Sequence, residues 1–158
     1  MQDLLSTHFT QPLPGLGWGA TVLRLGVACL AGGLLGWERE VHDKAAGLRT
    51  HILIALAACL FALITIGLMS DPLTDDDSIR KDPVRLIEAV TAGVAFLAAG
   101  TIFTAGKSVQ GLTTGAGMWL AGAVGLCCGL GHLGLAVLVT LLALVILWLL
   151  KALARRLT

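Results

Sequence analysis

The sequence predicts an all-α membrane protein, a glycine-rich bundle of about five transmembrane helices. Of the 158 residues, 56% are hydrophobic and 13% are charged, about half the charged share of ordinary soluble domains. The charges gather between long apolar runs, and the mean hydropathy is +0.88. The 20 glycines are many for this length, and in lipid glycine lets helices approach closely.

Five segments are apolar over the roughly 20 residues that a helix needs to cross a bilayer. They run over residues 17–37, 50–69, 86–105, 113–131 and 133–150, between a tail (1–16) and a basic end (151–158). The very short turn at Gly131-His132 predicts an antiparallel hairpin of the last two helices. The longest polar stretch, residues 70–85, is too short to bury a core of its own, so we expect no soluble domain, including after the fifth span.

Basic residues in the loops predict the orientation, because positively charged loops stay in the cytoplasm. Arg39, Lys44 and Arg49 lie in the first loop, on the same side as Lys107 and the basic end. In the opposite loop, aspartates outnumber the basic residues. We therefore place the N-terminus outside and the C-terminus in the cytoplasm. The acidic cluster at 71–77 is either a solvated loop or an attraction for a divalent cation, without the spacing of an EF-hand.

The densest polar segment, residues 36–51, joins the first two spans. It is a solvated loop, a fixed charge network at the membrane face, or a docking surface. Glu40 and Lys44, and likewise Glu38 and His42, are four residues apart and would share a helix face. The candidate interaction residues here are Glu38, Arg39, Glu40, Lys44, Gly47, Arg49, Thr50 and His51.

A second cytoplasmic segment, residues 106–115, joins the third and fourth spans. Its Gly-Lys-Ser tripeptide lacks the first glycine and the preceding strand of a Walker A loop, so we reject nucleotide binding. A tight hairpin explains the segment better, with Thr113 or Thr114 capping the fourth span as Thr50 caps the second. The candidate interaction residues here are Lys107, Gly111, Thr113 and Thr114.

Two charged residues fall inside predicted spans. Arg24 lies about 10 Å deep in the first span at 1.5 Å per residue, and Glu88 lies near the outer end of the third. A charge at mid-bilayer costs about 2.5–3.5 kcal/mol on insertion scales. Either the two side chains pair across a helix interface, or Arg24 reaches the headgroups and Glu88 is interfacial. Thr101 is expected to hydrogen-bond to a neighbouring helix.

Small residues recur every four positions on the first and fourth spans, a pattern that lets helix backbones touch. The stripes either pack within the chain or form a homodimer face. The candidate packing residues are Gly32, Gly36, Gly93, Gly100, Gly117 and Gly125.

The residues give no support to several function classes. The net charge of +1 argues against a nucleic-acid partner. The cysteines and histidines lack zinc-ligand spacing, so no metal or cofactor is assigned, and no ligand pattern supports magnesium. No catalytic constellation of Ser/His/Asp or Cys/His type is visible, so we do not expect an enzyme.

Several motifs resemble those of the MgtC/SapB family of bacterial inner-membrane proteins. The strings GWERE (36–40) and KAAGLRTH (44–51) are the most specific, and FLAAGTI (96–102), GLTT (111–114) and MW (118–119) follow in the same order. The resemblance is to a short form, because longer members carry a soluble domain after the fifth span. This chain has Glu88 where members often have Gln, and Ala for Gly in the FLAAG string.

The resemblance implies a five-span inner-membrane protein linked to magnesium homeostasis, stress adaptation and virulence. We expect a non-enzymatic regulator or accessory protein, present as a homodimer in the bilayer and acting on another membrane protein, such as the ATP synthase that some members are said to regulate. The alternative is a transporter or channel for a small solute or ion, magnesium included, in which a dimer encloses a polar path near Arg24, Glu88 and Thr101.

Overall fold

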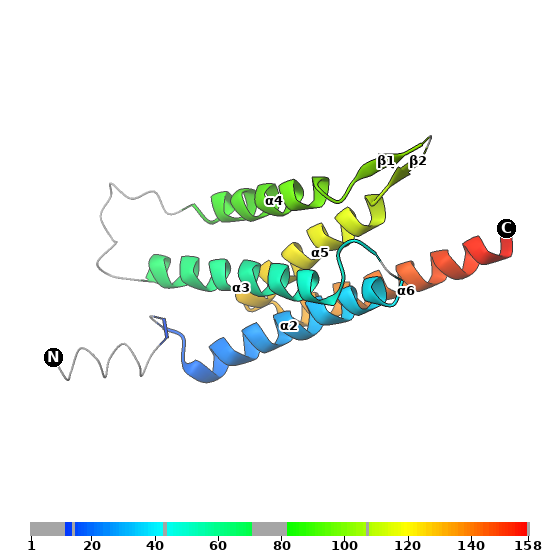
Figure 1. The fold of residues 1–158 in the computed structure, drawn as a ribbon. Coiled ribbons are helices and arrows are strands. Elements are labelled where there is room, and N and C mark those ends of the chain that lie inside the picture. The colour runs from blue at the N-terminus through cyan, green and yellow to red at the C-terminus, as the bar shows by residue number, and fades with distance from the viewer. Residues whose placement is uncertain (1–11, 14, 43, 71–81, 107, 158) are drawn as a thin grey trace.

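The computed structural model confirms the predicted all-α membrane fold. It describes residues 12–13, 15–42, 44–70, 82–106 and 108–157, the last eight by their backbone alone. The elements within these ranges are shown in Figure 1: α2 (Trp18–Glu40), α3 (Leu48–Ser70), α4 (Pro83–Ala99), β1 (Phe103–Ala105), β2 (Ser108–Gln110), α5 (Leu112–Gly129) and α6 (Leu133–Leu157).

Helix α3 is the centre of the packing, between α2 and α5. Its small side chains Ala55, Cys59 and Ala62 are completely buried, spaced so that they share the faces covered by the two neighbours. Ala28 of α2 and Ala121 of α5 are buried just as fully. Small residues at these contacts let the helix axes lie close together, as expected for packing in lipid.

Three of the described helices, α2, α3 and α5, are long and apolar enough to cross a membrane. Helix α4 has 17 residues, which cover about 25 Å at 1.5 Å per residue, somewhat less than the roughly 30 Å of a hydrocarbon core. Large apolar side chains point outward around the molecule, among them Leu30 (71% exposed), Phe96 (81%) and Trp148 (72%). Contact with lipid removes the cost of exposing these side chains. The number of membrane crossings and the orientation stay predictions.

The third predicted span, 86–105, has the wrong limits. Helix α4 begins earlier, at Pro83, because proline suits the first helical position and the Asp82 side chain accepts a hydrogen bond from Val84 N at 3.1 Å. It also ends earlier, at Ala99, and the chain enters strand β1. The predicted tight hairpin is present as an antiparallel pair of strands that turns at Gly106, where φ is +64°.

The predicted threonine caps are wrong. Helix α3 begins at Leu48 and α5 at Leu112, so Thr50, Thr113 and Thr114 all lie inside a first turn. Gly111 precedes α5 instead, with φ +85° and no side-chain cap. Only glycine fits there, because a Cβ would collide with the carbonyl oxygen of Thr101.

Helices α5 and α6 form the predicted antiparallel hairpin (Figure 1). Helix α5 ends in a Schellman motif, in which His132 N donates to Cys127 O at 2.8 Å and Gly131 N donates to Cys128 O at 3.0 Å. Gly131 adopts the left-handed conformation that this motif requires, with φ +89°. The short turn therefore satisfies the carbonyl groups at the end of α5 while reversing the chain.

The glycine stripes of α2 and α5 pack within the chain, against α3. A Cβ on Gly32 would lie 2.7 Å from His51 O, and one on Gly36 would lie 2.8 Å from Leu48 Cα. A Cβ on Gly125 would collide with the backbone of Ala55. These stripes are thus occupied by α3, which is the intramolecular alternative of the two that the sequence left open.

Two of the predicted packing glycines do not pack. A Cβ on Gly93 would meet nothing within 4 Å, and the nearest atom to one on Gly100 is Leu97 O of the same helix, at 3.3 Å. Both residues lie on α4 or at its end, and this helix contacts α5 and α3 mainly through other residues, including Val94 and Ala98. Gly93 instead lines an apolar groove of about 510 Å³ between α3 and α4.

Candidate functional site

A cavity of about 610 Å³ lies where the end of α2 and the loop after it meet the start of α5 and the side of α6. We call it the charged-end cavity. Six predicted interaction residues line it: Glu38, Arg39, Lys44, Gly111, Thr113 and Thr114. The other lining residues are His42, Val109, Leu112 and Leu147. The structure thus brings two separate predicted segments of the chain to one place.

A partly buried charge network lines this cavity. The Arg39 side chain is only 8% exposed, and its guanidinium group forms an ion pair with the carboxylate of Glu38. His42 lies beside them, with Nδ1 3.4 Å from Glu38 Oε1 and 2.6 Å from Glu38 O. A buried arginine needs such a partner, because an uncompensated charge would be strongly destabilising. Glu38, Arg39 and His42 thus form a fixed network, whereas Lys44 and Arg49 of the same segment are exposed. A docking role for the segment stays a prediction.

Glu40 caps the helix that follows it. Its Oε2 accepts a hydrogen bond from Leu48 N at 2.9 Å, and the carboxylate lies against the positive end of the α3 dipole. Gly47 makes room for this contact, since a Cβ there would collide with Glu40 Oε2. Glu40 and Lys44 do not share a helix face, because α2 ends at Glu40, and the Glu40 carboxylate instead closes the loop between α2 and α3.

His51 was predicted to lie on the interaction face, but it is completely buried. Its ring fits because glycines face it from both sides, Gly36 on α2 and Gly117 on α5. Nδ1 donates to Gly47 O at 2.9 Å, which leaves Nε2 as the acceptor. Among the buried side-chain nitrogen and oxygen atoms that the structure describes, Nε2 of His51 is the one without a hydrogen-bond partner. His51 is therefore a packing residue at the junction of three helices and cannot touch a partner directly.

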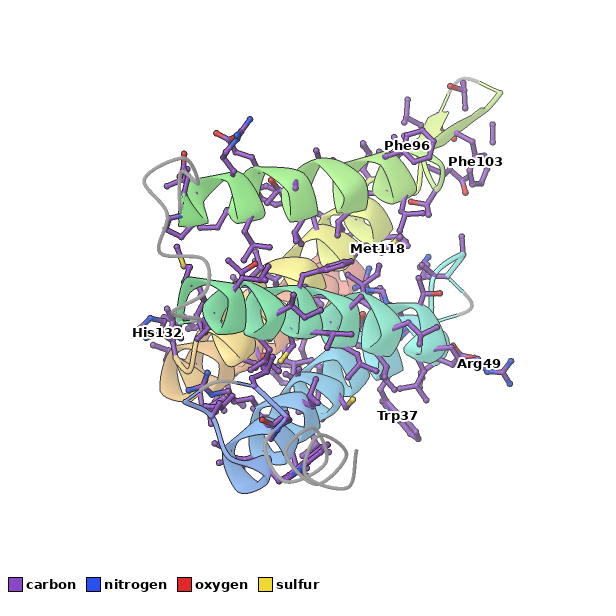
Figure 2. The ribbon with its side chains drawn as sticks, turned by 90° about the vertical axis from the view of Figure 1, so that its left-hand side faces the viewer. Trp37, Arg49, Phe96, Phe103, Met118 and His132 are labelled. Atoms are coloured by element: carbon purple, nitrogen blue, oxygen red, sulfur yellow. The ribbon has the colours of Figure 1, made fainter. Side chains whose placement is uncertain are left out.

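Arg49 has the opposite placement. It is exposed and extends away from the helices into the surroundings (Figure 2). Thr50, next to it, is half-buried. Lys107 and the acidic cluster at 71–77 lie outside the described residues. Arg49, in the first turn of α3, is therefore an exposed positive charge close to the cavity residues in the chain but not part of the cavity lining.

The three intramembrane polar residues do not gather. Arg24 does not pair with Glu88: its Nη1 donates to Gly129 O at 2.8 Å, a favourable place for a cation at the end of α5. Glu88 is exposed on α4. Thr101 donates to Ala98 O in its own turn at 2.8 Å rather than to another helix. Arg24 lies beside the end of α5, at Gly129, and Thr101 lies beside its start, at Gly111. Within one chain, these residues therefore do not line the polar path that the transport alternative requires.

Four cavity residues escaped the list of candidates made from the sequence. His42 had a usable signal, because its four-residue spacing from Glu38 placed the two on one face. Val109, Leu112 and Leu147 had none, since they are ordinary apolar residues. Leu147 comes from the last helix, and only the tertiary packing brings it to the start of α5.

The chain is similar to known proteins over most of its length. The MgtC family profile matches residues 25–156. YhiD of Escherichia coli K12, named a putative magnesium transporter, is 36% identical over 126 residues, which are 80% of this chain and 58% of the relative. MgtC of Brucella abortus is 38% identical over 120 residues, 76% and 47%. MgtC of Salmonella typhimurium is 37% identical over 135 residues, 85% and 54%.

No solved structure matches the chain. The chain spans about half the length of these relatives, so the activities of the whole relatives do not transfer to it directly. The matched residues include the charged loop between α2 and α3, the segment before α5 and the glycines that contact α3. With its apolar, outward-facing helices, the chain is a membrane protein that belongs to the MgtC family.

Proposed function

We propose that the chain is a non-enzymatic regulator or accessory protein of the bacterial inner membrane, linked to magnesium homeostasis and to adaptation under stress or in virulence. It spans the membrane several times and acts on another membrane protein through its charged end. The observation that carries this proposal is the convergence of a partly buried charge network, a cavity and the exposed Arg49 at one end of the bundle. The names of the MgtC and YhiD relatives supply the link to magnesium.

The packing around α3 supports this proposal over transport. Gly125 lies so close to the backbone of Ala55, and Gly129 to that of Cys59, that no side chain fits between the helices. A solute path needs room, and the close approach of α5 to α3 leaves none at these two contacts. The packing of a single chain therefore favours a protein that binds a partner over one that conducts a solute between α3 and α5.

A protein-interaction experiment tests the proposal. The tagged chain is extracted from membranes in mild detergent and its partners are identified by mass spectrometry. We expect a membrane-protein partner that is recovered with the wild type and with Arg85→Ala, and lost with Arg49→Ala. Arg85 is a matched control because it is also an exposed arginine, but at the other end of the bundle.

A liposome experiment tests the alternative of magnesium transport. The purified chain is reconstituted into liposomes that contain a magnesium-sensitive dye, and the external magnesium concentration is raised. We expect the same slow leak as in empty liposomes. Saturable magnesium entry that depends on the protein would overturn the regulatory proposal in favour of transport.

A further inference from the structure

The lining of the charged-end cavity is chemically mixed. Besides Glu38, Arg39 and His42, it includes Lys44, Thr113, Thr114 and the backbone at the start of α5, all of which can donate hydrogen bonds. It also includes the apolar residues Val109, Leu112 and Leu147. A cavity of this kind suits a ligand with a polar head joined to an apolar tail.

The charged residues of the cavity lining favour an anionic ligand. The carboxylate of Glu38 is committed to Arg39, and that of Glu40 is committed to Leu48 N outside the cavity. The carbonyl oxygen of Arg39, at the end of α2, already accepts hydrogen bonds from His42 N and Lys44 N, each at 3.2 Å. The exposed side chain of Lys44 adds a positive charge that neither of these two carboxylates neutralises.

The start of α5 adds to this preference. The first N–H groups of a helix have no acceptor within the helix, and the helix dipole makes this end positive. Most helices satisfy such groups with a side chain at the preceding position, but Gly111 has none to offer. Thr113, exposed in the first turn, adds a hydroxyl donor beside them. Phosphate oxygens are the acceptors that such a combination binds best.

We propose that the charged-end cavity binds a phosphate ester, carried by the headgroup of an anionic phospholipid. The helices that form the cavity, α2 and α5, are two of those able to cross the membrane, so the cavity opens at the depth where lipid headgroups lie. Leu112 and Leu147 then contact the upper part of an acyl chain. This site is independent of the partner-docking role of Arg49, which does not line the cavity.

A binding titration tests the site. The full chain in detergent is titrated calorimetrically with dioctanoyl phosphatidylglycerol, which is soluble enough to be added as monomers. We expect saturable binding by the wild type, and about tenfold weaker binding by Lys44→Gln, the loss of one charge-assisted hydrogen bond. Lys44 is exposed, so this variant is expected to fold normally.

Arg49→Gln is the matched control, because it removes the same charge from the same loop without touching the cavity, and it is expected to bind as the wild type does. Equal weakening by Lys44→Gln and Arg49→Gln would mean general charge attraction and would overturn the site. No effect of Lys44→Gln would overturn it as well. A second titration with inorganic phosphate distinguishes the source of the group: we expect far weaker binding, and equally tight binding would overturn the assignment to a lipid.

Discussion

At the scale of single residues, the charged side chains of this membrane protein stabilise helix ends. Glu40 accepts from Leu48 N at the start of α3, and Arg24 donates to Gly129 O at the end of α5. Each charge matches the sign of the dipole at its helix end. The Arg24 contact also satisfies a backbone carbonyl that lipid could not satisfy.

The cap formed by Glu40 leads to a stability prediction. Glu40→Ala removes the acceptor for Leu48 N, and we expect it to lower the free energy of unfolding by about 1 kcal/mol. Thermal unfolding of the purified protein in detergent measures this as a lower midpoint. Glu88→Ala is the control, because Glu88 is an exposed carboxylate on α4, and it should unfold as the wild type does. Equal midpoints for Glu40→Ala and the wild type would refute the capping role.

Neither residue's partner could be predicted from the sequence. Arg24 and Gly129 are 105 positions apart, and Leu48 N is eight positions from Glu40, beyond any local capping rule. His51 illustrates the same limit, because nothing in its neighbourhood along the chain shows that glycines of α2 and α5 will enclose it. The sequence did predict which residues are unusual, because charges in apolar surroundings are visible without a structure.

At the scale of elements, the long apolar runs were enough to predict α2, α3 and α5 to within a few residues and the start of α6, but α6 continues to Leu157, past the predicted end at 150 and into the predicted basic tail. The small-residue stripes further indicated that α2 and α5 have a face for close packing. The partner of that face, α3, could not be predicted, since the stripes say nothing about what covers them. The hairpin after α4 was predicted, but the limits of α4 and the strands β1 and β2 within the hairpin were missed, because a pair of three-residue strands depends on pairing across the turn rather than on a periodic pattern.

The glycine contacts predict a strong contrast between two substitutions. Gly125→Ala places a methyl group against the backbone of Ala55, and we expect it to destabilise the protein by about 1–3 kcal/mol or to prevent folding. Gly93→Ala adds the same methyl group in open space on α4 and should leave stability unchanged or raise it slightly. Gel filtration and thermal unfolding in detergent measure both. Similar behaviour of the two variants would contradict the packing of α5 on α3.

At the scale of the whole molecule, the two ends of the bundle differ. One end carries the charged-end cavity and Arg49, and the other carries the turn at His132 (Figure 2). The positive charge of the first end predicts that it faces the cytoplasm. A homodimer is a further proposal at this scale, and the stripes on α2 and α5 are not its interface because α3 covers them.

The orientation is tested with a reporter fused after Thr158. A phosphatase that is active only outside the cytoplasm should be inactive in this fusion, whereas a fluorescent protein that folds only in the cytoplasm should be bright. The matched fusion in the opposite loop, after Ser70, should give the reverse pattern. An active phosphatase at Thr158 would contradict the orientation.

The central claim is that the charged end acts on a partner to support growth when magnesium is scarce. The most direct measurement is the growth rate, at limiting magnesium, of a deletion strain complemented with the wild type, Arg49→Ala or Arg85→Ala at equal protein levels in the membrane. We expect the wild type and Arg85→Ala to restore growth and Arg49→Ala to fail. Full rescue by Arg49→Ala would contradict the claim.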